Sequence, residues 1–200
     1  YRLPATSKFV IPHPLISEAK PKLMPGERFA PEKIIKIGVV GIIRQDKPIA
    51  EVIKKIQEYL NSNPSGCELV IGTPLAEKPT WLDELNAQLY DTTEESDYIK
   101  VLQEIDILVI HYQPERYYYR TSGVISDAAS CGCYIIASDY PVIKHQINYP
   151  VTIGATFQDF AEIPSLIAKG ITSIQKNGKD ANWQWREKRT AEAIAAILTA

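Results

Sequence analysis

The stretch YRTSGVISDAASCGCYIIASD, residues 119–139, decides the fold of this 200-residue chain. A polar loop leads into a helix of small residues that begins at Ser122, and the apolar strand CYIIASD follows that helix directly. Ser122 is a favourable N-cap, and the unpaired N–H groups of a first helical turn attract anions. The stretch therefore predicts one helix-and-strand unit of an α/β fold, with an anion site at the loop that enters the helix.

The same alternation continues on both sides of this unit. Apolar runs at residues 34–43, 67–72 and 105–112 predict buried strands, and apolar positions at 3/4 spacing predict a helix over 48–61. The remaining segments are a weak helix over 80–88, a short strand at 89–90, a helix over 92–104 with a Thr92/Glu95 capping box, a short apolar segment at 151–153, and two closing helices over 160–175 and 183–198. Strands that are apolar throughout, separated by helices, predict a Rossmann-like, doubly wound parallel sheet.

We expect three parts along the chain: residues 1–33, 34–176 and 177–200. Prolines at positions 12, 14, 21, 25 and 31 exclude a helix or a central strand, so the first part is predicted to be an extended arm or interdomain linker. The second part carries the sheet, and the third forms the C-terminal closing helix. The first residue is Tyr1 rather than Met, which suggests a fragment or a processed product.

Composition narrows the class of protein. The chain is 45% apolar and 23% charged with a formal net charge of -2, and its Lys and Arg residues are scattered, which argues against a nucleic-acid-binding surface. The apolar runs have strand length, so no membrane-spanning helix or signal peptide is predicted. Cys67, Cys131 and Cys133 are odd in number and lack a second Cys/His pair, which favours reduced thiols, a cytoplasmic location and no metal site.

Candidate binding residues follow the strands, where a doubly wound sheet places its ligands. Arg and Lys in the loop after the first strand are suited to phosphate oxygens, and a carboxylate one helical turn into the small-residue helix is suited to sugar hydroxyls. We predict a diphosphate site here, and loss of Lys47 is expected to weaken binding by about 10- to 100-fold. The candidates are Gly41, Arg44, Lys47, Gly72, Thr73, Arg120, Thr121, Ser122, Gly123 and Asp127.

Several motifs in this order carry a family resemblance. GIIRQDK at residues 41–47, SGV at 122–124 with Ala128, and GCYIIASD from Gly132 together resemble the C-terminal, donor-binding half of a GT-B-fold glycosyltransferase, most similar to the retaining family 4 type. VIPHP at residues 10–14 resembles the segment where such proteins leave their N-terminal domain, so the likeness covers about residues 10–174.

This resemblance implies specific roles. Arg44 and Lys47 would contact the diphosphate of a UDP- or GDP-sugar co-substrate, the helix that carries Ser122, Gly123 and Val124 would bind the pyrophosphate, and neither a cofactor nor a metal would be needed. The family commonly has two glutamates eight residues apart, where this chain has Tyr119 and Asp127. Asp127 can still accept hydrogen bonds from ribose, and Glu115 lies in the same loop as Tyr119. No catalytic residue is assigned.

The resemblance also implies a missing half. The N-terminal domain that holds the acceptor, a glycan or a lipid-linked sugar, is absent from these 200 residues, as is any peripheral membrane contact made through it. We therefore expect this chain to bind donor without transferring sugar by itself. Two alternatives stay open: a non-enzymatic flavodoxin-like interaction module that uses its loops and arm for a partner protein, and one half of a GT-B-fold epimerase.

Overall fold

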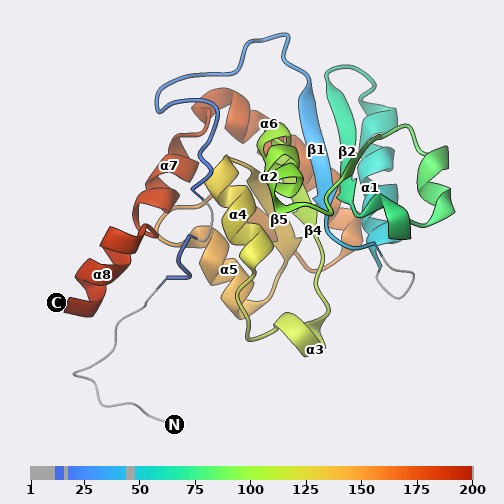
Figure 1. The fold of residues 1–200 in the computed structure, drawn as a ribbon. Coiled ribbons are helices and arrows are strands. Elements are labelled where there is room, and N and C mark those ends of the chain that lie inside the picture. Colours follow the sequence, from blue (N-terminus) through green and yellow to red (C-terminus); the bar gives the residue numbers. More distant parts are fainter. Residues whose placement is uncertain (1–11, 16–17, 44–47, 200) are drawn as a thin grey trace.

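The structure is a computed structural model that describes residues 12–15, 18–43 and 48–199. Six strands form one sheet in the order β3-β2-β1-β4-β5-β6 (Figure 1). They are β1 (Ile35–Val40), β2 (Cys67–Thr73), β3 (Gln88–Asp91), β4 (Ile107–Ile110), β5 (Tyr134–Ser138) and β6 (Gly154–Phe157). All neighbouring strands are parallel, which confirms the predicted doubly wound sheet.

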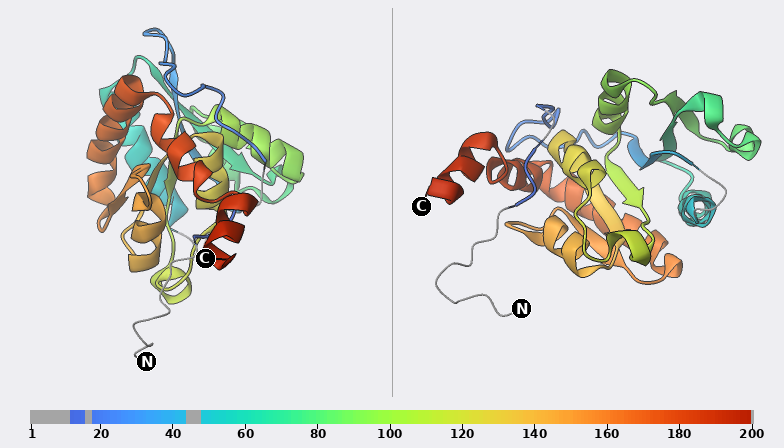
Figure 2. Two further views of the ribbon diagram at one scale, coloured as in Figure 1. Left: turned by 90° about the vertical axis from the view of Figure 1, so that its left-hand side faces the viewer. Right: turned by 60° about the horizontal axis from the view of Figure 1, so that its bottom comes forward.

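Helices cover both faces of the sheet (Figure 2). The α-helices are α1 (Ile49–Ser62), α2 (Glu95–Glu104), α3 (Pro114–Tyr117), α4 (Gly123–Cys131), α5 (Pro141–Asn148), α6 (Ile163–Asn177), α7 (Asp180–Glu187) and α8 (Ala191–Thr199), with 3-10 turns at Leu75–Glu77, Thr80–Glu84 and Phe160–Glu162. One apolar core joins the sheet to α1 and α6, and a second joins it to α2, α4, α5 and α7. Each face is therefore closed, as continuous apolar strands require.

Two of the predicted strands are shorter than expected. β1 ends at Val40 because Gly41 adopts φ +126°, a conformation that favours glycine and breaks the extended backbone. β4 ends at Ile110, so His111 and Tyr112 leave the sheet and enter the loop. Both strand ends lie at the same edge, since the strands are parallel, and this edge is where a ligand site is expected.

The structure also corrects three helix predictions. The Thr92/Glu95 capping box is wrong, because Glu94 is the N-cap of α2 and the nearby Asp91 carboxylate accepts the Thr93 N–H at 3.0 Å. Within the segment 80–88, only the short 3-10 turn Thr80–Glu84 is helical, and Gln88 already belongs to β3. The expected helix over 183–198 is divided into α7 and α8, which are separated by residues 188–190. The helix α5 was not predicted.

The described part of the proline-rich arm lies along α4 and α7 without helix or strand of its own. Ser130 donates to the carbonyl of Ala19 at 2.7 Å, and the Trp183 indole donates to the carbonyl of Leu23 at 2.9 Å. Side chains of α4 and α7 thus donate hydrogen bonds to backbone carbonyls of the arm, and these bonds fix the path of the arm. Among the described helices, none combines the length and the apolar character needed to cross a bilayer.

Candidate functional site at the carboxyl edge of the sheet

A cavity of about 280 Å³ opens between the ends of β1 and β4. The chain turns to opposite sides of the sheet from these two neighbours, so the cavity lies at the switch point of the strand order, where ligands of such sheets bind. It is lined by Val40, Gly41, Ile42, Pro48, Ile49, Ile110, His111, Tyr112, Gln113, Arg116, Tyr117 and Val124. Two predicted residues, Gly41 and Val124, are therefore brought together although 83 positions separate them in the sequence.

Ser122 is the N-cap of α4, as predicted from the sequence. Its hydroxyl accepts the N–H of Ile125 at 3.2 Å, and its carbonyl accepts the N–H of Ser126 at 3.2 Å. The residue is 2% exposed, and its own N–H is donated to the side chain of Gln146 at 3.0 Å. Ser122 therefore fixes the start of the helix, while its polar atoms are already engaged inside the protein.

The next two amides are the ones that a ligand can use. Among the described residues, no acceptor is bound to the N–H groups of Gly123 and Val124. A side chain at Gly123 would meet no atom within 4 Å, so this turn of the helix is open to an approaching group. Arg120 and Thr121, immediately before the cap, are exposed. The start of α4 thus offers unpaired N–H groups beside two accessible polar side chains, which is the local chemistry of an anion site.

Asp127 lies one turn into α4 but faces another neighbour. Tyr98 of α2 donates its hydroxyl proton to the Asp127 carboxylate at 3.1 Å, and Asp127 is not among the described residues that line the cavity. Burial raises the pKa of this carboxyl above its ordinary value, an effect that the Tyr98 hydrogen bond and the nearby His13 oppose. The structure therefore places Asp127 between α4 and α2.

Gly72 and Thr73 close the end of β2 rather than lining the cavity. A side chain at Gly72 would come within 3.0 Å of both Thr92 and Val101, which indicates close packing, and Thr73 is 1% exposed. Gly72 also accepts the N–H of Gly41 at 2.9 Å and so holds the bend that ends β1. Arg44 and Lys47, the predicted diphosphate ligands, lie outside the described residues.

His111 is a candidate that the sequence predictions missed. It follows β4 directly, lines the 280 Å³ cavity, and also lines a second hollow of about 200 Å³ beside Ser138 and Asp139. Its Nδ1 lies 3.0 Å from the Ser138 hydroxyl, and burial lowers the pKa of its imidazole. The ring is therefore mainly uncharged at neutral pH. Its position at a strand exit is the signal that could have identified it, together with Gln113 and Arg116 in the same loop.

Asp139, at the exit of β5, is anchored by its neighbours. It accepts hydrogen bonds from Thr156 at 2.8 Å and Gln158 at 3.1 Å, and Lys144 lies 3.1 Å from its carboxylate. Burial opposes ionisation here, but these three partners outweigh it and lower the pKa of Asp139. The second hollow therefore has a fixed negative charge on one side and His111 on the other.

Two tyrosines line the cavity, and two more follow them in the sequence. Tyr112 stacks on Tyr117 with ring centroids 4.0 Å apart, and its hydroxyl is hydrogen-bonded to Ser122. Tyr118 and Tyr119 are 41% and 83% exposed. Tyr119 is thus accessible to solvent at the position where the resembled family commonly has a glutamate. No cluster of three or more His, Cys, Asp or Glu residues suited to a metal occurs among the described residues.

Comparison with solved structures identifies the architecture. The chain is similar to the lipopolysaccharide outer core galactosyltransferase WaaB (16% identity, TM-score 0.61, covering 96% of this chain and 54% of that one). It is also similar to WaaG, a glycosyltransferase of lipopolysaccharide biosynthesis (12% identity, TM-score 0.62, covering 90% of this chain and 51% of that one). A third similar structure is the pneumococcal O-GlcNAc transferase GtfA in complex with UDP and GlcNAc (14% identity, TM-score 0.54, covering 90% of this chain and 37% of that one). No protein-family model matches the sequence, and no curated protein matches it.

At these identities the likeness shows the fold, and it confirms the prediction of a Rossmann-like half of a GT-B architecture. The chain spans 35% to 54% of the length of the structures it resembles.

Proposed function

We propose that this chain is the nucleotide-sugar-binding domain of a glycosyltransferase of the retaining family 4 type and that it takes a UDP- or GDP-sugar as donor. The observation that supports the proposal is the cavity at the β1/β4 switch point, which joins the Gly41 bend to the first turn of α4. GtfA, whose fold is similar, binds UDP in its own structure.

The chemistry of the site suits a diphosphate leaving group. In glycosyl transfer, negative charge develops on the departing nucleoside diphosphate, and donors already fixed in place stabilise that charge. The N–H groups of Gly123 and Val124, which no acceptor in the described part of the chain engages, would provide two such donors at the positive end of α4. Arg116 of α3, with Arg44 and Lys47 from the loop after β1, would supply the cations. In this proposal the protein needs no metal at the diphosphate.

The acceptor belongs to the other half of the enzyme. The chain covers 54% or less of the glycosyltransferases named above. We propose that an additional domain holds a glycan or a lipid-linked sugar and that this chain alone binds donor without transferring it.

Calorimetry with UDP, GDP and ADP tests the binding proposal. We expect a millimolar or tighter dissociation constant for UDP or GDP, and a loss of affinity of about 10- to 100-fold in Lys47→Ala.

Gly123→Asp should also abolish nucleotide binding, because it places a negative charge where the phosphate is expected. It should not destabilise the fold, since acidic residues favour helix starts. Gly123→Ala and Lys100→Ala, the latter an exposed residue of α2, are the matched controls. Absence of nucleotide binding, or equal binding by Gly123→Asp and Gly123→Ala, would contradict the proposal.

An interaction module is the second candidate, because Tyr118 and Tyr119 are exposed beside the cavity. Under this alternative, nucleotides leave the melting temperature unchanged, and a partner protein protects residues 117–120 from hydrogen exchange. Calorimetry and exchange together therefore separate the two candidates.

A further inference from the structure

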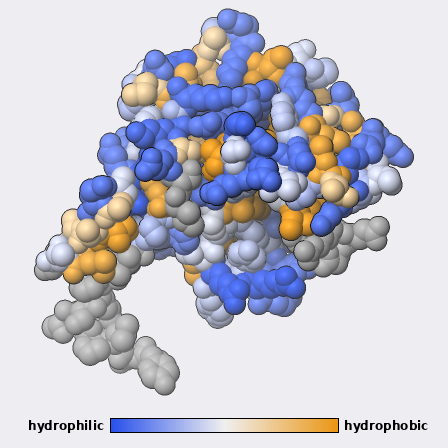
Figure 3. Space-filling view, viewed as in Figure 1, coloured by the Kyte–Doolittle hydropathy of each residue, from blue (hydrophilic) through white to orange (hydrophobic). Residues whose placement is uncertain are grey.

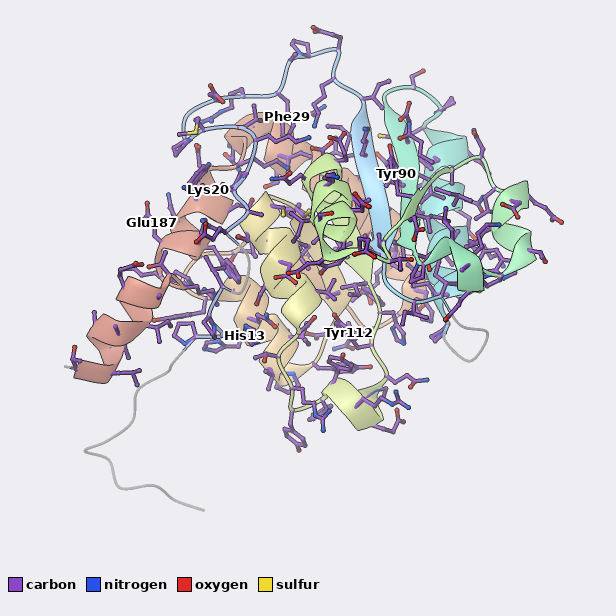
Figure 4. The ribbon with its side chains drawn as sticks, in the orientation of Figure 1. His13, Lys20, Phe29, Tyr90, Tyr112 and Glu187 are labelled. Atoms are coloured by element: carbon purple, nitrogen blue, oxygen red, sulfur yellow. The ribbon has the colours of Figure 1, made fainter. Side chains whose placement is uncertain are left out.

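A second cavity, of about 180 Å³, lies at the opposite end of the sheet. It is lined by the arm, by the segment that leads into β4, and by the link between α6 and α7. Figure 4 shows Phe29, which lines this cavity, far from Tyr112, which lines the cavity at the carboxyl edge. The two cavities are therefore separate, and a ligand in one does not depend on a nucleotide in the other.

The lining of this cavity has an excess of positive charge. Among the described lining residues, Lys22, Arg28, Lys33 and Lys179 are accompanied by one carboxylate, that of Asp106. Lys22 and Arg28 have acidic partners outside the lining, Glu104 and Asp180 respectively. Lys33 and Lys179 do not, because both are paired with the same oxygen of Asp106. Two ammonium groups thus share one carboxylate, which leaves one positive charge without a matching negative charge in the lining.

Lys179 is the group that this arrangement leaves unsatisfied. Its side chain is 6% exposed, and its Nζ makes no hydrogen bond within the described part of the chain. The nearest carboxylate oxygen, Asp106 Oδ1, is 3.6 Å away, and the Phe29 ring centroid lies at 4.9 Å. Burial lowers the pKa of this amine, while Asp106 opposes that effect. A buried ammonium group normally has its donors satisfied, so its free N–H groups require an explanation.

Asp106 does not satisfy those donors in the described geometry, because its Oδ1 lies 3.6 Å from Lys179 Nζ. Its Oδ1 already accepts from Lys33, and its Oδ2 accepts the backbone N–H of Lys36 at 3.0 Å. The Lys179 stem packs close to Gly132, since its Cδ lies 3.3 Å from the point that a Cβ at position 132 would occupy. An acceptor that enters the cavity would satisfy the remaining donors of the ammonium group.

We propose that this cavity binds a small oxyanion, the phosphate or carboxylate group of a small metabolite, through the ammonium groups of Lys179 and Lys33. The anion would complete the charge balance of a buried cluster. It would also connect three segments, because Lys33 belongs to the arm, Asp106 precedes β4, and Lys179 is the N-cap of α7. Occupation of the site would thereby hold the arm against the body.

The test uses inorganic phosphate and succinate as probes, at constant ionic strength. Melting temperature and amide NMR shifts are measured for the whole chain, for Lys179→Met and for the control Lys176→Met, an exposed lysine of α6. We expect a saturable rise in melting temperature with at least one probe, with shifts around Phe29, Lys33 and Lys179. Lys179→Met should weaken binding by at least about tenfold, as loss of a charge-assisted hydrogen bond implies, and Lys176→Met should not.

Specific outcomes would overturn the proposal. These are the absence of a saturable response to either probe, an equal response in Lys179→Met and Lys176→Met, or shifts confined to Val124 and His111 at the nucleotide cavity. If Lys179→Met does not fold, the shift map of the unmodified chain and the response of Lys33→Met decide the question. Failure of nucleotide binding leaves this test unaffected, because the amide shifts that indicate binding in the two cavities belong to different residues.

Discussion

At the scale of single residues, small side chains set how closely the layers approach. Gly38 in β1 lies under Ile105, and a Cβ at position 38 would stand 2.3 Å from Ile105 Cδ1. Gly123, in contrast, faces open space. The two glycines thus have different roles: Gly38 allows close packing of the core, and Gly123 leaves the first turn of α4 open to an approaching group.

The substitution Gly38→Ala tests the packing role. We expect it to lower the free energy of unfolding by about 1–3 kcal/mol, because the added methyl group overpacks the core against a 2% exposed Ile105. Urea unfolding is the measurement, with Gly123→Ala as the control that should change little. Equal stabilities of the two variants would show that Ile105 moves aside without cost.

The substitution Asp127→Asn has a pH dependence of definite sign. Burial raises the pKa of Asp127 above the value that it has in the unfolded chain, so its ionisation destabilises the folded state. The variant should therefore be more stable than the unmodified chain at neutral pH, and this advantage should shrink as the pH falls toward about 4, the unfolded value, and be absent below it. Urea titrations at pH 7 and pH 3.5 check this. A variant that is less stable at pH 7 would mean that the hydrogen bond from Tyr98 outweighs burial.

At the scale of secondary-structure elements, Glu104 at the end of α2 connects two other segments. Lys22 of the arm and Lys36 of β1 both contact its carboxylate, the latter at 2.7 Å. These two lysines, Lys22 first, lower the pKa of Glu104 to about 2, against a smaller opposing effect of burial. The charge cluster thus helps to fix where the arm crosses the sheet.

Glu104→Gln should reveal that connection through pH. The carboxylate stabilises the fold above its unfolded pKa, about 4.5, and loses this effect as the pH falls toward 2. The variant should be less stable at pH 7 by about 1 kcal/mol or less, since the group is partly exposed, and the difference should vanish near pH 2. Chemical unfolding at pH 7, 4.5 and 2.5 measures it. A difference at pH 2.5 as large as the difference at pH 7 would contradict an electrostatic origin.

Sequence periodicity predicted most of these elements for an identifiable reason. Strands such as β4 are buried on both faces, so every residue is apolar and the run stands out from its neighbours. The helix α5 was missed because its apolar positions, such as Ile143 and Ile147, are few within eight residues. The break between α7 and α8 was missed because it contains neither Gly nor Pro, the residues that usually mark an end.

The candidate site was predictable only in part. The cap at Ser122 follows from local chemistry, and the structure confirms it. The burial of the Ser122 N–H against Gln146 depends on tertiary packing between α4 and α5, which no local pattern reveals. His111 was assigned to a strand because HY extends an apolar run, whereas the strand stops one residue earlier. Phosphate contacts by Arg44 and Lys47 stay a prediction.

At the scale of the whole molecule, the two C-terminal helices have different roles. Trp185 of α7 is fully buried and donates its indole N–H to Gln146 at 2.8 Å, whereas α8 has no buried residue and Leu198 is 61% exposed. Figure 3 shows apolar side chains gathered on α8 where it projects from the body. α7 thus closes the fold, and α8 extends away from it.

Removing residues 191–200 should therefore leave the free energy of unfolding within about 0.5 kcal/mol of the original, while Trp185→Ala should lower it by about 3–5 kcal/mol. The shortened chain should also show less concentration-dependent association, because an exposed apolar surface is removed. Denaturant unfolding and light scattering after size exclusion check both statements. Marked destabilisation by the truncation would show that α8 packs on the body in solution.

The parallel arrangement of the strands has a consequence for how the chain acquires its structure. Even the nearest neighbours along the sequence, β2 and β3, pair residues 18 positions apart, Val70 with Gln88, and the central pair joins Ile37 to Ile107. During synthesis on the ribosome, about 70 residues must follow β1 before β4 can pair with its second edge. Until then this edge of an apolar strand is uncovered. Such remote pairings slow the folding reaction and expose the nascent chain to aggregation, so this domain is expected to fold in milliseconds to seconds rather than microseconds.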